Sequence, residues 1–394
     1  MSSRKVQFRS PAVGRRSPQK STDEFEVVIR DLASDGRGVG EAPDGQIVFV
    51  AGAWNGERVH VRRTRQGGKT ATELVNIIEA HESRTEPVCD HHRLDKCGGC
   101  PWMFVRYETQ LSAKRQKLQV ALQSLGAPQV DPIVHPSPRT LGYRNRAQFK
   151  TDGKILGYLG ASSHQITDVK TCPILTSQNQ AHLSRLREEL PNNKWRPKSK
   201  HKWVTLDIDD QRSDVWVNQR QHFRQANDEQ NHMMSQWLQR VLKVPAPTGG
   251  LLELFCGNGN LTTVLASCFP DDRITAVEGD EYALEALLSL ELPNVMTQRR
   301  NLFSAMDVKA MVATLPSSQG IVLDPPRDGL KERDAFTPIF SKAPWVVYIS
   351  CNLATWQRDA HFLHEHGLVL TQVEGLDMFP QTPHLEILSV FERK

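Results

Sequence analysis

The feature that most constrains the fold is a series of short, almost wholly apolar runs from residue 249 onward. The runs cover residues 251–255, 274–278, 321–324 and 345–350, and stretches with helical patterning separate them. Near-continuous apolar runs of this length are typical of parallel strands that are buried on both faces of a sheet. Their alternation with helices predicts a doubly wound α/β domain. Two further segments, near residues 368 and 385, are predicted to be strands that complete the sheet.

The first 22 residues have a different composition. They contain six lysines and arginines and no acidic residue, although the whole chain carries a net charge of only +4. A basic tail with so few apolar residues cannot bury enough surface to fold, so residues 1–22 are expected to be disordered. Such arms often add salt-dependent affinity for phosphate backbones, but a solvated tail without a specific role fits the sequence equally well.

Residues 24–80 are predicted to form short strands joined by turns. Glycines crowd residues 34–41, and Pro43-Asp44-Gly45 is a turn signal. About five strands in this length are typical of a small closed barrel of the OB type. We therefore expect a barrel at 23–84, a central α+β domain at 85–220 and the doubly wound α/β domain at 221–394.

One helix of the central domain can be placed from its apolar face. Leu111, Leu118, Leu122 and Leu125 fall on one side of a helix, and Gly126 with Pro128 supplies the stop. No apolar run is long enough to cross a bilayer, and the basic N-terminal segment lacks the apolar core of a secretory signal. A cytoplasmic monomer that does not associate with membranes is expected.

A glycine-rich turn follows the first strand of the α/β domain. Gly257 and Gly259 let the backbone turn sharply and approach a ligand, as in dinucleotide-binding enzymes. The third glycine expected beside a pyrophosphate is replaced by Thr262, and Glu278 ends the next strand, where it can accept hydrogen bonds from a ribose. A nucleoside ligand without pyrophosphate fits better, and S-adenosylmethionine is the common one. A purely structural turn remains the alternative.

Two polar motifs end later strands of the same sheet. Asp324-Pro325-Pro326-Arg327 follows one strand, and Ser350-Cys351-Asn352 follows another. Ligands of open α/β sheets bind beyond the carboxyl ends of the strands, so both motifs are expected to face the ligand. Cys351 is a candidate nucleophile because a thiolate is reactive near neutral pH once its pKa is lowered. Taken alone, however, a cysteine at a strand end is more often a small core residue.

Taken together, these motifs carry a family resemblance. The chain resembles the RNA 5-methyluridine methyltransferases, a class I, S-adenosylmethionine-dependent family that includes 23S ribosomal RNA and transfer RNA enzymes. The resemblance spans residues 24–393, and the 24–80 barrel resembles the TRAM domain, an RNA-binding module of some branches. Seven motifs stand in the family's order: 223–227 (FRQAN), 254–260 (LFCGNGN), 277–279 (VEG), 301–302 (NL), 323–327 (LDPPR), 349–352 (ISCN) and 384–387 (HLEI).

The resemblance implies a Rossmann-like methyltransferase domain that methylates carbon 5 of a uridine in RNA. It implies that Cys351 is the nucleophile, which attacks carbon 6 of a flipped-out uracil, and that Glu386 is the base that later removes the proton from carbon 5. Arg327 is a candidate for positioning the base or the RNA. The residues implied to line the cofactor site are Gln225, Phe255, Asn260, Glu278, Asn301 and Asp324.

Four further cysteines suggest a metal centre. Cys89, Cys97, Cys100 and Cys172 include the pair Cys97-Gly98-Gly99-Cys100, which lets two thiolates converge on one centre. The ribosomal RNA branch of the family holds a [4Fe–4S] cluster with a similar set, which implies a central iron–sulfur domain; zinc is the alternative. Seven residues separate the first two cysteines where five are usual, and Asp90, His91 and His92 lie in that longer loop. Cys256 and Cys268 are predicted to be core thiols.

Rival functions remain on the sequence alone. A ribosome-assembly or other RNA-binding factor could keep the fold without the chemistry, but the presence of Cys351, Glu386 and Asp324 argues against it. DNA cytosine methyltransferases place their nucleophile after a proline, unlike Cys351, which follows Ser350. A barrel together with the four cysteines favours 23S ribosomal RNA as the substrate, with a transfer RNA uridine as the alternative.

Overall fold

The structure is a computed structural model of the 394-residue chain. It describes residues 21–66, 69–93, 97–127, 130–160, 165–198, 200–219, 221–242, 249–316 and 319–394. The expected basic tail lies almost entirely outside the described residues, as does Pro128. Contacts divide the chain into two compact units, Met1–Glu82 and Ser83–Lys394. Within the described ranges, no helix is both long and apolar enough to span a membrane. The division into four parts stays a prediction.

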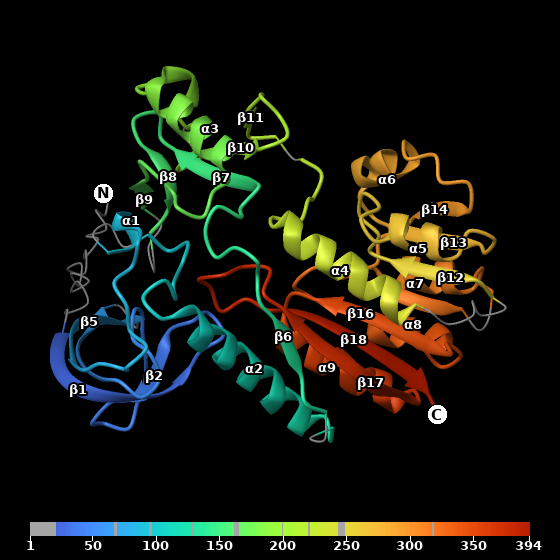
Figure 1. The fold of residues 1–394 in the computed structure, drawn as a ribbon, viewed down its shortest axis with the longest axis horizontal. Coiled ribbons are helices and arrows are strands. Elements are labelled where there is room, and N and C mark those ends of the chain that lie inside the picture. Colours follow the sequence, from blue (N-terminus) through green and yellow to red (C-terminus); the bar gives the residue numbers. More distant parts are fainter. Residues whose placement is uncertain are drawn as a thin grey trace, which may run out of the picture. The chain divides into compact units, whose positions relative to one another are not determined.

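The first unit is a curled antiparallel sheet of five strands, coloured blue in Figure 1. Val27, Ile29, Val50, Val59 and Val61 alternate with outward-facing residues and form its small core. No hydrogen-bond ladder joins the two end strands in the described part of this unit, so the sheet is a half-barrel and not the closed barrel expected from the sequence. The strands lie in the order β3-β2-β1-β4-β5: β1 (Ser21–Leu32), β2 (Gly38–Glu41), β3 (Ile47–Val50), β4 (Arg58–Gln66) and β5 (Lys69–Glu79).

The second unit begins with the cysteine-bearing region. One short helix, α1 (Asp90–Arg93), precedes the long helix α2 (Tyr107–Ser124), which ends where Gly126 adopts a φ of 73°. The helix predicted from the leucine spacing is therefore confirmed, and Leu118, Leu122 and Leu125 are buried. A second antiparallel sheet follows in the order β11-β10-β7-β8-β9, with α3 (Ser177–Glu188) and the 3-10 turn η1 (Asn193–Trp195) beside it: β7 (Arg146–Thr151), β8 (Leu156–Leu159), β9 (Ile166–Asp168), β10 (Val204–Asp209) and β11 (Trp216–Val217).

The predicted doubly wound domain is present as a mixed sheet of eight strands in the order β14-β13-β12-β15-β16-β18-β17-β6. The first five of these run parallel, and β18 runs antiparallel to both of its neighbours. β6 (Ile133–His135) joins this sheet from far upstream in the chain. The other strands are β12 (Leu251–Leu254), β13 (Ile274–Glu278), β14 (Val295–Arg299), β15 (Gly320–Leu323), β16 (Trp345–Ser350), β17 (Leu368–Leu376) and β18 (Glu386–Arg393).

Helices cover both faces of this sheet (Figure 1). Alternate residues of β15 and β16 enter different cores: Leu323 and Tyr348 face one layer, whereas Val322 and Val347 face the other. This explains the continuous apolar runs, because neither face of these strands meets solvent. One layer holds α2, α7 (Ala305–Val312), α8 (Arg333–Phe340) and α9 (Leu353–Glu365); the opposite layer holds α4 (Asp228–Val241), α5 (Thr262–Cys268) and α6 (Glu281–Leu288).

Candidate active site

The polar motifs meet at the carboxyl edge of the parallel strands. Leu254 is in register with Val277 on one side and Leu323 on the other, and Leu323 is in register with Tyr348. The next residues, Phe255, Glu278 and Asp324, therefore lie at one edge of the sheet. This edge is where open α/β sheets bind their ligands.

The glycine-rich turn after β12 is tightly constrained. Gly259 has a φ of 96°, and a Cβ atom there would lie 2.6 Å from Leu287 Cδ1, so only glycine fits. Phe255 also has a positive φ, 61°, which is rare for an aromatic residue and is a form of strain that gathers at functional sites. The Gly257 N–H donates to Glu278 Oε2 at 3.2 Å. The Glu278 carboxylate therefore holds the turn closed, and its Oε1 also accepts from the Gly279 and Asp280 N–H groups, which leaves a lone pair on Oε2 for a further donor.

Side chains from other elements complete this end of the sheet. Asn260 exchanges two hydrogen bonds of 2.9 Å with Asn231 of α4, which sequence reasoning missed because α4 lies outside the glycine motif. The Asn301 carboxamide accepts from the Phe303 N–H at 3.0 Å. Phe303 in turn packs on Phe255 with ring centroids 5.6 Å apart. Gln225 is buried ahead of α4, and its carbonyl accepts from the Asn145 side chain.

Cys351 and Glu386 are brought together by the antiparallel pairing of β16 with β18. Ser350 is in register with Ile387, so the same ladder continued by one residue sets Cys351 opposite Glu386. The pKa of the Cys351 thiol is raised to about 12, first by burial and then by the Glu386 and Asp324 carboxylates, while Arg327 opposes them. These four side chains therefore form one electrostatic cluster.

Of the two carboxyl groups of this cluster, Glu386 is buried and Asp324 is partly buried. Burial raises the pKa of Asp324 to about 7. Burial and the neighbouring Asp324 raise the pKa of Glu386 well above its usual range, and Arg327 lowers it. A carboxylate with a raised pKa is a stronger base than one in water, which suits a general base.

The loop that carries Arg327 is fixed to the start of α9. The Asn352 side-chain amide donates to the Arg327 carbonyl at 3.0 Å, and its oxygen caps α9 by accepting from the Ala354 N–H. The Thr355 hydroxyl also donates to the Arg327 carbonyl. Cys351 thus lies directly before a helix N-terminus and close to a cation, and both favour the thiolate form.

The comparisons with known proteins decide the family. Residues 193–394 match the family model described as tRNA (Uracil-5-)-methyltransferase. The chain belongs to this family. An RNA methyltransferase of Nitrosomonas europaea (NE1857) is 35% identical over 94% of this chain and 97% of its own length. The 23S rRNA (uracil(1939)-C(5))-methyltransferase RlmD of Halomonas elongata is 30% identical over 98% of this chain and 92% of its own.

A solved structure shows the same fold. The Pyrococcus abyssi tRNA (uracil-54, C5)-methyltransferase in complex with S-adenosyl-L-homocysteine superposes with a TM-score of 0.68 at 18% identity. The match covers 93% of this chain and all of the Pyrococcus chain. The methyltransferase fold expected from the family resemblance is thereby confirmed.

His384 is a residue of this methyltransferase whose place the sequence left undefined. It lies two residues before Glu386, and its ring meets that of Phe379 edge-on with centroids 6.1 Å apart. Burial, then Arg327, Lys114 and the other nearby cations, lowers the pKa of His384 to about 4. The imidazole is therefore neutral at physiological pH. The only sequence signal for it was its place in the 384–387 motif.

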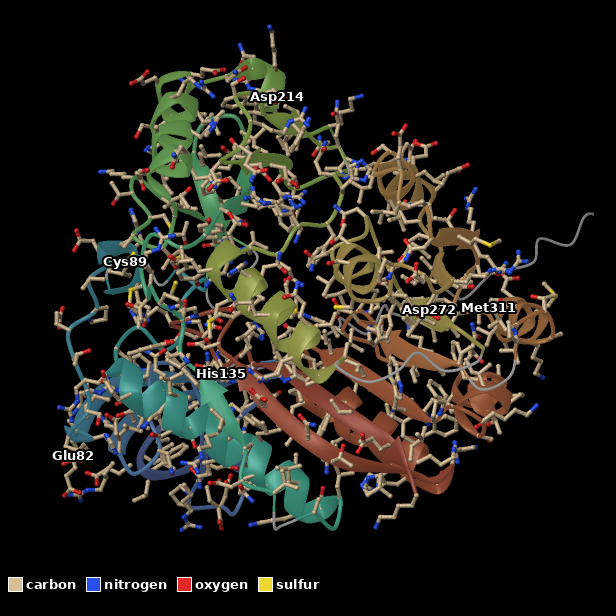
Figure 2. All side chains as sticks on the ribbon, turned by 45° about the vertical axis from the view of Figure 1, so that its right-hand side comes forward. Glu82, Cys89, His135, Asp214, Asp272 and Met311 are labelled. Carbon is tan, nitrogen blue, oxygen red and sulfur yellow. The ribbon has the colours of Figure 1, made fainter. Side chains whose placement is uncertain are left out.

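The four predicted metal-binding cysteines of the methyltransferase line one cavity. Its volume is about 140 Å³, and His91 and His92 also line it. Cys89 is labelled in Figure 2 among neighbouring sulfur atoms. Burial raises the pKa of Cys100, and the other three cysteines add to this effect, so the four sulfurs are mutual neighbours. As they stand, no three His, Cys, Asp or Glu side chains in the described ranges form a group that could hold a metal ion.

The remaining residues of this region and the other thiols have simpler roles. His91 Nε2 accepts a hydrogen bond from the Lys170 N–H at 2.9 Å, which occupies that nitrogen. Cys256 is buried in a small core with Ala276 and Leu284. Cys268 is partly buried against the core that α4 and α5 share. The prediction of a core thiol is confirmed for Cys256, whereas Cys268 is only partly buried beside a core.

Proposed function

We propose that this chain transfers a methyl group from S-adenosylmethionine to carbon 5 of a uridine in RNA, through a covalent bond between Cys351 and carbon 6. The observation that carries the proposal is the pairing of Cys351 with Glu386 across β16 and β18, beside Asp324 and Arg327. A nucleophile and a base that face one another at the ligand-binding edge of the sheet suit chemistry on a single flat ring.

The steps balance with these groups alone. The Cys351 thiolate adds to carbon 6, and the electrons of the C5–C6 double bond pass into the ring as an enolate. Carbon 5 then forms a bond to the methyl carbon of the sulfonium, whose carbon–sulfur bond breaks and leaves S-adenosylhomocysteine. Glu386 removes the proton from carbon 5, the C5–C6 double bond forms again, and the bond from carbon 6 to Cys351 breaks to restore the thiolate.

The proposed methyl-donor site consists of Gln225, Phe255, Asn260, Glu278, Asn301 and Asp324. The residues fit a nucleoside: Glu278 can accept from ribose hydroxyls, and the Phe255–Phe303 pair offers an apolar wall for an adenine. Asn231 joins this set through its bonds to Asn260.

Two RNA substrates are considered. We favour 23S ribosomal RNA, because relatives such as the RlmD proteins of Halomonas elongata and Aliivibrio fischeri, which match over most of this chain, carry that substrate in their names. A transfer RNA uridine is the alternative, as the family description and the Pyrococcus structure suggest. The half-barrel is proposed to be a TRAM domain that binds RNA, and the protein to be a cytoplasmic monomer.

Cys89, Cys97, Cys100 and Cys172 are proposed to hold a [4Fe–4S] cluster. Thiolates that bind one zinc ion lie about 2.3 Å from it and leave no space between them. A cavity of about 140 Å³ among the four cysteines instead suits a larger group. When bound, such a cluster would cross-link the segments that carry the cysteines; none of the methyl-transfer steps uses it.

The test of the function is methyl transfer to defined RNA. Purified protein would be incubated with tritiated S-adenosylmethionine and either 23S ribosomal or transfer RNA transcripts, with Cys351→Ala and the matched control Cys268→Ala in parallel. We expect 5-methyluridine in 23S RNA from the parent and from Cys268→Ala, and none from Cys351→Ala. Label in transfer RNA alone would overturn the substrate, and no label in either RNA would favour an RNA-binding factor.

The test of the cluster is metal analysis after anaerobic purification. We expect about four iron atoms and four acid-labile sulfides per chain, and loss of both in Cys172→Ala. About one zinc ion per chain without sulfide would replace the cluster with a zinc site.

A further inference from the structure

The segment that carries the proposed base is unusual for a connection between two strands. We call residues 377–385, which join β17 to β18 and lead directly into Glu386, the base loop. Connecting segments normally run over the surface. In the base loop, Asp377, Met378, Gln381, Thr382 and Leu385 are instead buried. Most of the chain lies between this loop and the residues on and near α2 that contact it.

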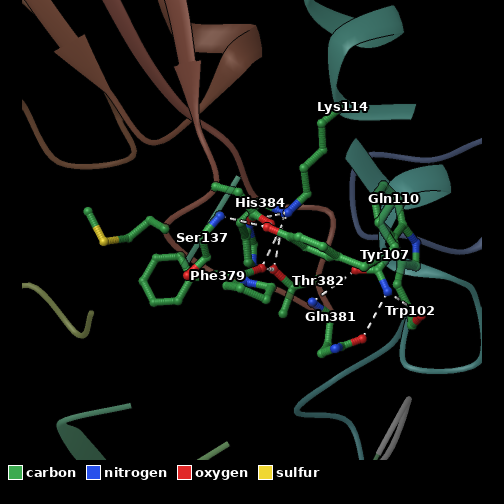
Figure 3. A network of polar contacts seen from close by, with 12 residues as sticks. Trp102, Tyr107, Gln110, Lys114, Ser137, Phe379, Gln381, Thr382 and His384 are labelled. Atoms are coloured by element: carbon green, nitrogen blue, oxygen red, sulfur yellow. Dashed lines mark hydrogen bonds and ion pairs between the residues drawn. The ribbon is translucent and has the colours of Figure 1, made fainter. Parts of the chain in front are cut away.

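An ion pair from α2 holds the first residue of the base loop. Lys114 and Asp377 pair through Nζ and Oδ1, and both side chains are fully buried. The Tyr107 hydroxyl donates to the second oxygen of Asp377 at 2.7 Å. Lys114 also donates to the Phe379 carbonyl at 3.3 Å (Figure 3). Side chains from two successive turns of α2 thus hold the start of the base loop in place.

A pair of glutamines holds the middle of the base loop. The Gln110 amide donates to Gln381 Oε1 at 2.9 Å, and the Gln381 N–H donates to Gln110 Oε1 at 3.0 Å. Gln110 also donates to the Val105 and Trp102 carbonyls, while the Trp102 N–H donates to the Gln381 carbonyl. Gln381 has a φ of 69°, a conformation that these contacts fix in place (Figure 3).

Stability alone does not account for this arrangement. Replacing a buried ion pair by apolar residues of similar volume is often neutral or stabilising, because taking both charges out of water costs so much. What the pair supplies instead is a fixed orientation of the Asp377 side chain, because that carboxylate can bond to Lys114 and Tyr107 together in only one orientation. Because Asp377 begins the base loop, its fixed orientation also constrains the positions of His384 and Glu386 at the other end.

We propose that Gln110 and Lys114 are positioning residues for Glu386. By holding the base loop they keep the Glu386 carboxylate in line with the proton on carbon 5 after methyl transfer. They therefore act on the last step, release of the methylated RNA from Cys351, and leave the earlier attack and methyl transfer unchanged. This inference rests on the proposed function.

The test separates the two halves of the reaction. Enzyme in excess over labelled RNA with natural uridine would be quenched over time, with methyl label and denaturation-resistant protein–RNA adduct measured separately. For Gln110→Met and for the double variant Lys114→Met/Asp377→Asn we expect methyl incorporation at the parent's rate. Adduct should accumulate, and steady-state turnover should fall by about tenfold to a hundredfold, the range expected when a reacting group is slightly misplaced.

The double variant is needed because Lys114→Met alone would leave a buried, unpaired carboxylate and fail to fold. Arg115→Met is the matched control, since Arg115 lies on the same helix in an exposed pair with Asp131. Unfolding temperatures would be compared throughout. A double variant that is as stable as the parent and releases RNA at the parent's rate would overturn the positioning role. A parent that transfers no methyl group would overturn the proposed function, and this inference with it.

Discussion

At the scale of single residues, the site without a bound methyl donor does not favour the thiolate form of Cys351, the nucleophile of the proposed reaction. Burial, together with the Glu386 and Asp324 carboxylates, raises the pKa of Cys351 to about 12, so the thiol form predominates at neutral pH. A cation placed beside the cluster would favour the charged forms of all three acids. The sulfonium of the methyl donor is such a cation, so donor binding should activate the thiol.

Alkylation of Cys351 tests this activation. In the free protein the thiol has a raised pKa, so its reaction with iodoacetamide should be slow at pH 8 and accelerate as pH rises. S-adenosylmethionine should raise the rate at pH 8 about tenfold for each unit by which it lowers the pKa, whereas the neutral thioether S-adenosylhomocysteine should not. Both ligands restrict access alike, so equal rates with the two would contradict the prediction.

At the scale of elements, strand β12 carries an acid that the reaction does not use. Glu253 is fully buried in the sheet, and burial raises its pKa from 4.5 to about 8. Between these values the unfolded chain has lost the proton and the folded chain retains it. Because the folded state then binds more protons, the free energy of unfolding falls as pH rises from about 4.5 to 8.

The variant Glu253→Gln should remove this pH dependence. Its unfolding free energy in urea should fall less steeply than the parent's between pH 5 and 8, with a difference of about 2 to 5 kcal/mol across that range. Parallel curves for parent and variant would show that Glu253 is ionised in the folded state.

The elements also show what a sequence can predict. The parallel strands were predicted because burial on both faces leaves a continuous apolar run, as in residues 345–350. The strand Ile133–His135 was missed, because it has three residues and owes its existence to pairing with β17. The base loop was missed for the same reason: nothing near Lys114 in the sequence points to Asp377. Local sequence patterns predict elements and motifs. A buried contact between residues 263 positions apart, such as Lys114 and Asp377, can be found only once the fold is known.

At the scale of the whole molecule, the excess of positive over negative charge lies at one end of the sequence. Six of the 49 lysines and arginines lie in residues 1–22, where no acid offsets them. In the first folded unit, by contrast, Arg58, Arg62, Arg63 and Arg65 all pair with acids. The tail is therefore the part of this end of the chain with the greatest excess of positive charge for phosphates.

Deleting residues 2–20 should weaken RNA binding in a salt-dependent way. We expect the slope of log Kd against log salt to decrease by about 4 to 5, because each of the six lost cations releases close to one counterion on binding. Filter binding from 50 to 300 mM salt measures the slope. An unchanged slope would show that the tail is only solvated, and methyl transfer at saturating RNA should be the same in both proteins.

The contacts between α2 and the base loop have consequences for the synthesis of the chain and for the expression of its parts. A ribosome releases α2 and β6 long before β17 and β18, so the apolar face of α2 stays uncovered until those two strands emerge. The nascent chain therefore cannot modify RNA before β17 and β18 have emerged. The family segment, residues 193–394, contains Cys351 and Glu386 but neither Lys114 nor Gln110. Expressed alone, it would carry every reacting group and lack the support that aims one of them.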